Sequence, residues 1–248
     1  MIGSAKKLTG FRLRAEDGEI GKIRDVYFDD HTWTVRYLVV DTGHWLPGRM
    51  VLISPQSVGE PDWSGHILPV SLTKEKIENS PDIDADQPVS RQIQSRLAAH
   101  YQWTPYWGTY AGPAVAWLRE SEADAQVAVA EEEETRHDPH LRSISEVLGY
   151  ELHATDGQIG HVRDFLVQAD GWVIRYMLVK TGHWLAGRNV LVSPTWITDL
   201  EWARAQVDVD LPRQSIQTAP EFDIEKPLTR DYEDALHEHY ERPKYWKP

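Results

Sequence analysis

The chain has 248 residues and no cysteine, which excludes disulfides and thiolate metal sites. Its formal net charge is −13, and no basic cluster is larger than Lys6-Lys7, so a nucleic-acid partner is not expected. No apolar run approaches the roughly 20 residues that span a bilayer, and the N-terminal segment lacks the apolar core of a signal peptide. We therefore expect a soluble, cytoplasmic protein without membrane insertion; docking on a membrane complex remains open.

The chain contains an internal repeat. The segment Thr42–Pro55 recurs almost letter for letter as Thr181–Pro194, an offset of 139 residues, and the register holds over roughly a hundred residues. A match of this length indicates duplication of one unit. We predict a first unit at residues 1–108, an acidic flexible linker at 109–140 that includes Glu131–Glu134, and a second unit at 141–248.

Each unit is predicted to begin with short strands. In the first unit the expected strands are Leu8–Ala15, Glu19–Asp29, Trp33–Asp41, Arg49–Ile53 and Trp63–Val70. Turn residues separate them, and a break in the alternation near Gly21 predicts a β-bulge. Several short strands with almost no helix between them favour a small barrel over a sandwich, because closure removes exposed sheet edges.

A helical arm follows the strands. Thr73 is a predicted N-cap for a helical turn, and Ser90 is a predicted N-cap for a helix over 91–101. In that helix Ile93, Leu97 and Tyr101 would share one apolar face. The corresponding helix of the second unit would begin after Thr229, with acidic residues in its first turn that suit the helix dipole.

These motifs resemble the PRC-barrel family. The pattern is Asp-Gly-x-Ile-Gly-x-x-Arg-Asp, a strand ending Arg-Tyr-x-x-Val, and Thr-Gly-x-Trp-x-x-Gly-Arg-x-Val-Leu, present at about residues 8–72 and again at 147–211. The family's barrel is shared by the cytoplasmic part of the photosynthetic reaction-centre H subunit and the C-terminal domain of the ribosome maturation factor. The resemblance implies a mainly β protein with two PRC-like barrels in tandem, and a fold used for docking onto larger complexes. It implies no catalytic residues.

The Gly-His-Trp turns are the first candidate site. His44 and His183 would be paired ligands or proton carriers, since histidine titrates near neutral pH. The alternative is structural: the glycines shape the loop, and Trp45 plugs one end of the barrel. A metal site needs three or four converging ligands, which the local sequence does not supply. We therefore predict no bound metal and no cofactor.

Two charged motifs could each be either a ligand site or a structural feature. Arg24-Asp25 with Arg49 would form an anion site, or else a structural ion pair or an arginine bonded to backbone. The alternation Asp82, Asp84, Asp86 resembles the start of a calcium loop, but the glycine and distal glutamate of such a loop are missing. An extended solvated arm is the simpler interpretation.

No catalytic constellation is visible. The chain has no nucleophile elbow, phosphate-binding loop or dinucleotide fingerprint. His237 and His239 lie two apart on a predicted helix and face different directions, and Ser54 and Ser193 precede proline at strand ends. We predict that the protein is not an enzyme.

The ends of the two arms are the remaining candidates. Large aromatic side chains anchor contacts well, within a fold or across an interface. The arm termini would therefore either bind a partner or fix each arm to its own barrel or to the sister barrel. The candidate interaction residues are Tyr106, Trp107, Tyr245, Trp246, His44 and His183.

The sequence favours a non-enzymatic protein-protein interaction or assembly module, acting on a protein partner or by self-association. Two alternatives remain: a sensor of a small molecule, quinone or metal, and an accessory factor of a photosynthetic or electron-transport complex.

Overall fold

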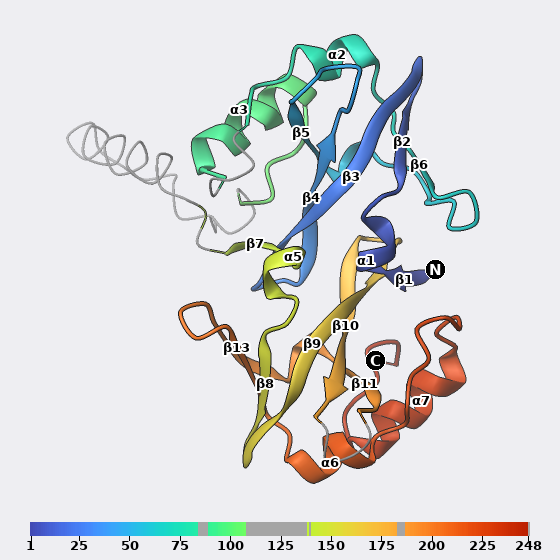
Figure 1. The fold of residues 1–248 in the computed structure, drawn as a ribbon, viewed down its shortest axis with the longest axis vertical. Coiled ribbons are helices and arrows are strands. Elements are labelled where there is room, and N and C mark those ends of the chain that lie inside the picture. The colour runs from blue at the N-terminus through green and yellow to red at the C-terminus, as the bar shows by residue number, and fades with distance from the viewer. Residues whose placement is uncertain (84–88, 108–137, 139, 183–186, 248) are drawn as a thin grey trace, which may run out of the picture. The chain divides into compact units, whose positions relative to one another are not determined.

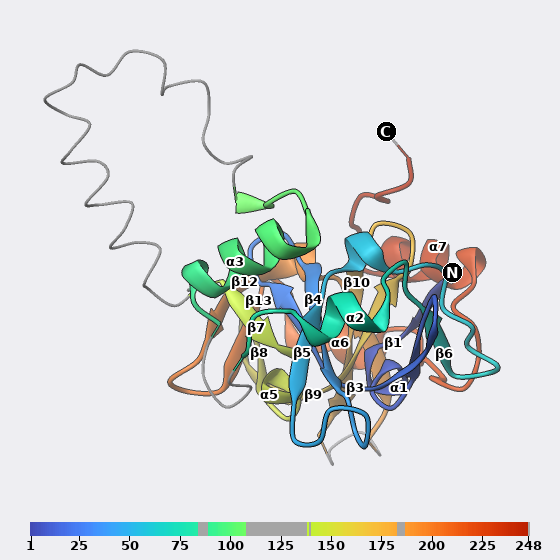
Figure 2. The same ribbon diagram turned by 90° about the horizontal axis from the view of Figure 1, so that it is seen from above.

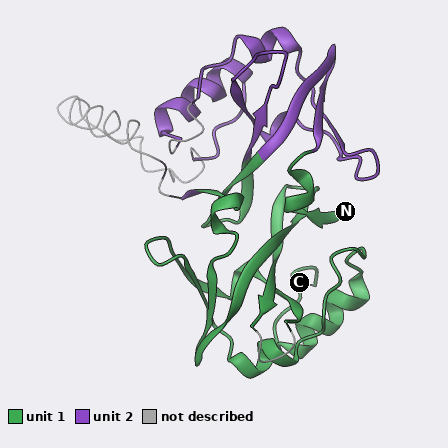
Figure 3. Ribbon diagram, in the orientation of Figure 1, with its two compact units in different colours: residues 1–10, 25–36, 142–248 green, residues 11–24, 37–141 purple. Residues whose placement is uncertain are grey.

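The computed structural model describes residues 1–83, 89–107, 138, 140–182 and 187–247, and its chain divides into two compact units (Figures 1 and 3). Unit 1 comprises Met1–Gly10, Asp25–Arg36 and Arg142–Pro248. Unit 2 comprises Phe11–Arg24 and Tyr37–Leu141. Unit 1 thus contains two segments of the first repeat together with most of the second. The domain boundaries read from the duplication remain a prediction.

The mainly β fold class is confirmed. The elements of the first half are β1 (Ile2–Ser4), α1 (Ala5–Leu8), β2 (Arg12–Ala15), β3 (Gly18–Asp29), β4 (Thr34–Asp41), β5 (Met50–Ile53), a 3-10 turn (Pro55–Ser57), β6 (Ile67–Pro69), α2 (Lys74–Glu78) and α3 (Arg91–Tyr101).

The second half repeats this order with one additional strand, β12. Its elements are β7 (Leu141–Ser143), α5 (Ile144–Val147), β8 (Glu151–Ala154), β9 (Gly157–Gln168), β10 (Val173–Thr181), β11 (Asn189–Val192), a 3-10 turn (Pro194–Trp196), β12 (Ile197–Glu201), β13 (Gln206–Val209), α6 (Arg213–Thr218) and α7 (Arg230–His239).

Most of the strand predictions are confirmed, and one is wrong at its start. The strand expected over Leu8–Ala15 begins only at Arg12, because Leu8 ends the short helix α1. The Ser4 side chain caps this helix by accepting a hydrogen bond from the Lys7 amide. The strand expected from Trp63 is also shorter, since only Ile67–Pro69 pairs as β6.

In unit 1 the strands run in the order β12-β13-β8-β9-β10, and β11 pairs with the opposite edge of β10. The pairs are antiparallel except for β13 and β8, which are parallel. Strand β1 pairs antiparallel with β9, so the N-terminus of the chain belongs to this unit (Figures 1 and 2).

In unit 2, strand β2 lies between β3, to which it is antiparallel, and β6, to which it is parallel. Strand β5 pairs antiparallel with β4. Helix α3 lies over β4, as Figures 1 and 2 show from two sides. The buried side chains of Tyr37 and Leu97 come from this strand and this helix.

The bulge expected near Gly21 is present. The register between β2 and β3 shifts between Leu13 and Arg14, opposite this glycine. A Cβ atom at Gly21 would lie 2.0 Å from the carbonyl oxygen of Asp41, and one at Gly160 would lie 2.3 Å from that of Lys180. Since real Cβ atoms do not approach oxygen so closely, each repeat needs glycine where its long strand crosses the next.

Two hairpin tips meet inside unit 1. The Val35 amide donates to the Trp172 carbonyl, and the Ile174 amide donates to the Trp33 carbonyl, both at 2.8 Å. Both tryptophans have left-handed backbone, with φ of 54° and 51°. The residues correspond through the repeat offset, so the pairing is reciprocal.

The two strand-helix segments that begin the repeats also bind reciprocally within unit 1. Ser4 Oγ donates to Asp164 at 2.5 Å, and Ser143 Oγ donates to Asp25, the equivalent residue, at 2.5 Å. Burial raises the pKa of Asp164, although the Ser4 hydroxyl and backbone amides partly offset it. Each repeat therefore supplies the hydroxyl that satisfies the other's strand carboxylate.

Among the helices of the described ranges, none has both the length and the apolar content needed to cross a bilayer.

Candidate interaction sites on the two arms

The first arm is held by a polar cluster around its helix, the first-arm cluster. Its members are Tyr37 from β4, Arg91 and Gln94 from α3, Tyr106 from the segment after α3, and Asp138. Gln94 has no exposed surface, and Asp138 is 6% exposed. Asp138 belongs to the predicted linker, so the end of that segment is packed into unit 2.

Three donors converge on one oxygen of Asp138. The Tyr106 hydroxyl lies 2.7 Å from Asp138 Oδ2, Gln94 Nε2 lies 3.2 Å away, and Arg91 Nη2 lies 3.1 Å away. Burial raises the pKa of Tyr106, and the Asp138 charge adds to the effect, so the phenol stays a donor. The arrangement is a charge-assisted anchor for the arm.

The equivalent second-arm cluster is built from Tyr176, Arg230, Glu233, His237 and Tyr245. Glu233 and His237 lie on α7 and are each 2% exposed. Glu233 Oε1 accepts from the Tyr245 hydroxyl at 2.8 Å and lies 3.0 Å from the Tyr176 hydroxyl; Glu233 Oε2 is 3.1 Å from Arg230 Nη1. Burial raises the pKa of Tyr176, and the charge of Glu233 raises it further.

His237 links this cluster to the end of the chain. Its Nδ1 lies 2.8 Å from the Pro243 carbonyl, which only accepts, so Nδ1 carries the proton. In the neutral ring Nε2 is an acceptor 3.0 Å from the Tyr176 hydroxyl, whose single proton also has Glu233 Oε1 within 3.0 Å. Burial lowers the pKa of His237, and its backbone bonds partly offset this, which favours the neutral ring.

The two clusters take their buried carboxylate from different positions of the repeat. Gln94 corresponds to Glu233 through the repeat offset, so the helix of the first arm carries a neutral amide where α7 carries an acid. The missing charge is supplied by Asp138, which lies outside the aligned part of the repeat. The arginine and tyrosine partners are the same in both.

An aromatic exchange accompanies this difference. In the first repeat Trp103 stacks on Tyr101 at 4.2 Å, and its Nε1 donates to Ser57 Oγ at 2.7 Å. In the second repeat the position of Ser57 is occupied by Trp196, whose ring lies 4.8 Å from Tyr240. A tryptophan therefore packs on the equivalent tyrosine in both arms, although it comes from a different part of the chain.

The arm ends form cation–π contacts. Arg91 lies over Trp107 at 4.8 Å, and Arg230 lies over Trp246 at 4.2 Å. Tyr245 is also flanked by Arg175 at 4.4 Å and is 41% exposed. Each tyrosine hydroxyl is bound within its own unit, as one of the two sequence alternatives expects, and a role in partner binding stays a prediction.

The comparisons agree with these motifs in the first repeat. Residues 3–76 match the PRC-barrel domain family. The chain contains a PRC-barrel domain. The chain is also 35% identical over 75 residues to an uncharacterised protein of Deinococcus radiodurans; this match covers 30% of the chain and 27% of that protein. The chain thus spans about a quarter of the length of this relative, and the second repeat is not part of the family match.

The PRC-barrel signature loop shows no ligand-binding geometry in its described part. His44 is exposed in a turn, and Trp45 is half-buried beneath the Lys74 ammonium at 4.6 Å. Thr42 Oγ1 lies 2.7 Å from the Leu46 carbonyl and 2.8 Å from the Arg49 carbonyl, which organises the loop. His183 lies outside the described residues, so its predicted role stays a prediction.

The arginine of this loop bonds to backbone. Arg49 donates to the carbonyls of Glu78 and Ser80, and Arg188 donates to those of Gln217 at 3.0 Å and Ala219 at 3.1 Å. Both arginines therefore attach the loop to the start of the arm. This is the backbone-bonded arginine that the sequence offered as the alternative to an anion site, and the Asp25 side chain accepts from Ser143.

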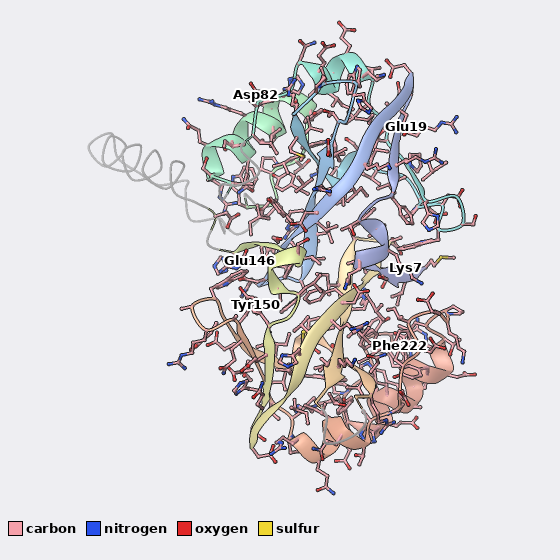
Figure 4. All side chains as sticks on the ribbon, in the orientation of Figure 1. Lys7, Glu19, Asp82, Glu146, Tyr150 and Phe222 are labelled. Carbon is pink, nitrogen blue, oxygen red and sulfur yellow. The ribbon has the colours of Figure 1, made fainter. Side chains whose placement is uncertain are left out.

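The calcium interpretation gains no support from the described carboxylates. Asp82, labelled in Figure 4, is 89% exposed and pairs with Arg49 at 3.1 Å. Asp84 and Asp86 lie outside the described residues. Across the described part of the chain, no group of three or more His, Asp or Glu side chains is placed to hold a metal.

The arm histidines have structural partners. Nε2 of His100 lies 2.7 Å from the Lys76 carbonyl, and Nε2 of His239 lies 2.8 Å from the Ser215 carbonyl. Because a carbonyl only accepts, these ring nitrogens donate. The equivalent bonds hold each arm helix against the preceding helix. In the second arm, Phe222, labelled in Figure 4, also packs edge-to-face on Tyr232, with ring centroids 5.3 Å apart.

Sequence reasoning missed the centre of both clusters. Leu97 and Tyr101 of the expected face of α3 are buried, but Gln94 is buried there and Ile93 is only half-buried. The available signal was a polar residue three positions before the buried leucine of each helix: Gln94 before Leu97, and Glu233 before Leu236. Such a residue lies on the same face as the leucine and is therefore a candidate for a buried polar contact. Asp138 had no such signal, because nothing local distinguishes it from the acidic linker.

Proposed function

We propose that this protein is a non-enzymatic assembly module, built on two copies of the PRC-barrel unit, that binds a protein partner through its second arm. The PRC-barrel domain at residues 3–76 supports an interaction role. The second copy rests on the repeated sequence and on the repeated order of elements.

The observation that carries the proposal is the setting of Tyr245. Apart from Met1, it is the large hydrophobic residue exposed within the described ranges. Its hydroxyl is fixed by the buried Glu233, while its ring remains accessible between Arg175 and Arg230. Tyr, Trp and Arg dominate interface hot spots, and a side chain held in place before binding loses less entropy.

Trp246 extends this surface. Its ring lies edge-to-face with Tyr245 at 4.7 Å and under Arg230. The second-arm surface therefore comprises Arg175, Arg230, Tyr245 and Trp246. A partner that offers carboxylates and an apolar depression matches its two guanidiniums and two rings.

The test is affinity purification of the full chain from its native cell, followed by reconstitution with the purified partner. We expect a stoichiometric complex whose dissociation constant rises at least about tenfold on Trp246→Ala, as for a hot-spot residue. Trp107→Ala, the equivalent change on the first arm, is the matched control and should leave affinity within about twofold.

Absence of a stoichiometric complex, or equal effects of the two substitutions, would contradict the proposal. A thermal shift produced by a quinone or a divalent metal without any protein partner would instead favour the sensor alternative.

A further inference from the structure

We propose that the first arm contains a carboxylate-binding pocket, formed by Arg91, Gln94 and Tyr106, in which Asp138 acts as an internal ligand. This is a site separate from the second-arm surface and does not depend on the assembly role. Its ligand class is a side-chain carboxylate carried on a peptide segment.

The pocket is defined by convergence on one atom. A guanidinium, a side-chain amide and a phenol hydroxyl reach Asp138 Oδ2 at 3.1, 3.2 and 2.7 Å. The three donors come from one helix and the segment that follows it, so the first arm builds the pocket by itself. The carboxylate comes from 31 residues beyond Trp107 in the chain.

Backbone contacts extend the recognition beyond the side chain. The Asp138 amide lies 3.3 Å from the Val89 carbonyl, and Asp138 Oδ1 accepts from the His140 amide at 3.1 Å. Val89 directly precedes the helix N-cap, so the occupant's main chain pairs with the entry to α3. A peptide carboxylate therefore fits the pocket better than a free anion.

In the second repeat the equivalent donors are occupied by a carboxylate of the same helix. There the acid is Glu233 on α7, covalently part of the same helix as Arg230 and next to its tyrosine partners. In the first repeat this position is Gln94, which donates to the acid instead of supplying it. The first arm is thus the one whose closure depends on an occupant from outside its helix.

Replacement of Asp138 by a soluble carboxylate tests the pocket directly. In the full chain, Asp138→Ala removes the internal ligand and leaves its donors in place. We expect 100 mM sodium acetate to raise the melting temperature of this variant by roughly 2–6 °C over sodium chloride at equal ionic strength, from mass action at a millimolar site. Wild type and Asp82→Ala, which loses an exposed carboxylate, should show no acetate-specific shift.

Acetamide is the neutral probe of the same shape and should give no shift. A folded Asp138→Ala variant that responds equally to acetate, chloride and acetamide overturns the proposal. Equal acetate shifts in the variant and wild type overturn it as well.

A second measurement decides the matter if Asp138→Ala does not fold. In Asp138→Asn, we expect amide exchange within residues 89–107 to accelerate at least about tenfold, with exchange in α7 unchanged, because local opening is governed by local contacts. Unchanged exchange in the first arm, or equal acceleration in both arms, would refute an internal ligand specific to the first arm.

Discussion

The two arms of this protein solve one packing problem with different residues. In both arms a tyrosine from the arm end and an arginine from the helix bind a buried carboxylate. The strand tyrosine contacts that carboxylate in the second arm and the Gln94 amide in the first. The second arm carries that carboxylate on its helix as Glu233. The first arm carries Gln94 there and takes the carboxylate from Asp138. Both arms therefore contain one buried carboxylate beside an arginine, but the residue that supplies the carboxylate lies at a different position in the chain.

The aromatic packing shows the same freedom. Trp103 and Trp196 come from non-equivalent positions, yet each lies against the equivalent tyrosine of its repeat. A protein core has to be filled, but the side chain that fills a space can come from different positions in the chain. Compensating exchanges of this kind are therefore tolerated.

Removing the apolar anchor common to both arms should have the largest effect. Leu97→Ala and Leu236→Ala should each lower the free energy of unfolding of their arm by about 2–5 kcal/mol, because both leucines are 0% exposed and their loss leaves a cavity. Hydrogen exchange of α3 and α7 measures the two losses separately. Ile93 is only half-buried, so Ile93→Ala is the control and should lower the free energy of unfolding by less. If the losses at the two leucines differ by more than about 2 kcal/mol, the two arms are not equivalent.

Moving the carboxylate of the first arm from Asp138 to position 94 should have the next largest effect on stability. Gln94→Glu sets a second carboxylate against Asp138 and removes a donor, so we expect a loss of about 2 kcal/mol. The double variant with Asp138→Asn has the arrangement of the second arm and should recover most of that loss. Urea unfolding with exchange of α3 as the local probe measures the cycle, and additive losses would show that the two clusters are not interchangeable.

The histidine should have the smallest effect. His237 has a folded pKa below its ordinary value of about 6.5, so below that pH the unfolded chain binds more protons. The second arm should therefore keep its full stability above about pH 6.5 and lose part of it as the pH falls, until the folded ring also titrates. The first arm has Ala98 at this position and should lack the effect.

His237→Gln should flatten this pH dependence in α7, measured by denaturant unfolding between pH 5 and 8. His44→Gln, at an exposed site, is the matched control. An unchanged slope in His237→Gln would assign the pH dependence to another group.

Local sequence signals predicted much of the fold. The bulge at Gly21 and the caps Thr73, Ser90 and Thr229 all appear where the sequence places them. These features depend on neighbouring residues alone, which is why a single sequence reveals them. Helix α1 was missed because its cap, Ser4, was assigned to a tail.

The sequence by itself determined the duplication, the positions of most strands along the chain and the bulge near Gly21, since repetition and alternation are visible in the residues themselves. Only the tertiary structure decided that residues 1–10 and 25–36 belong to a compact unit with the second repeat, and that Asp138 completes the first arm. The physical reason is that a buried charge is matched by proximity in space. A carboxylate distant in sequence serves as well as one on the same helix, and no local pattern distinguishes the two.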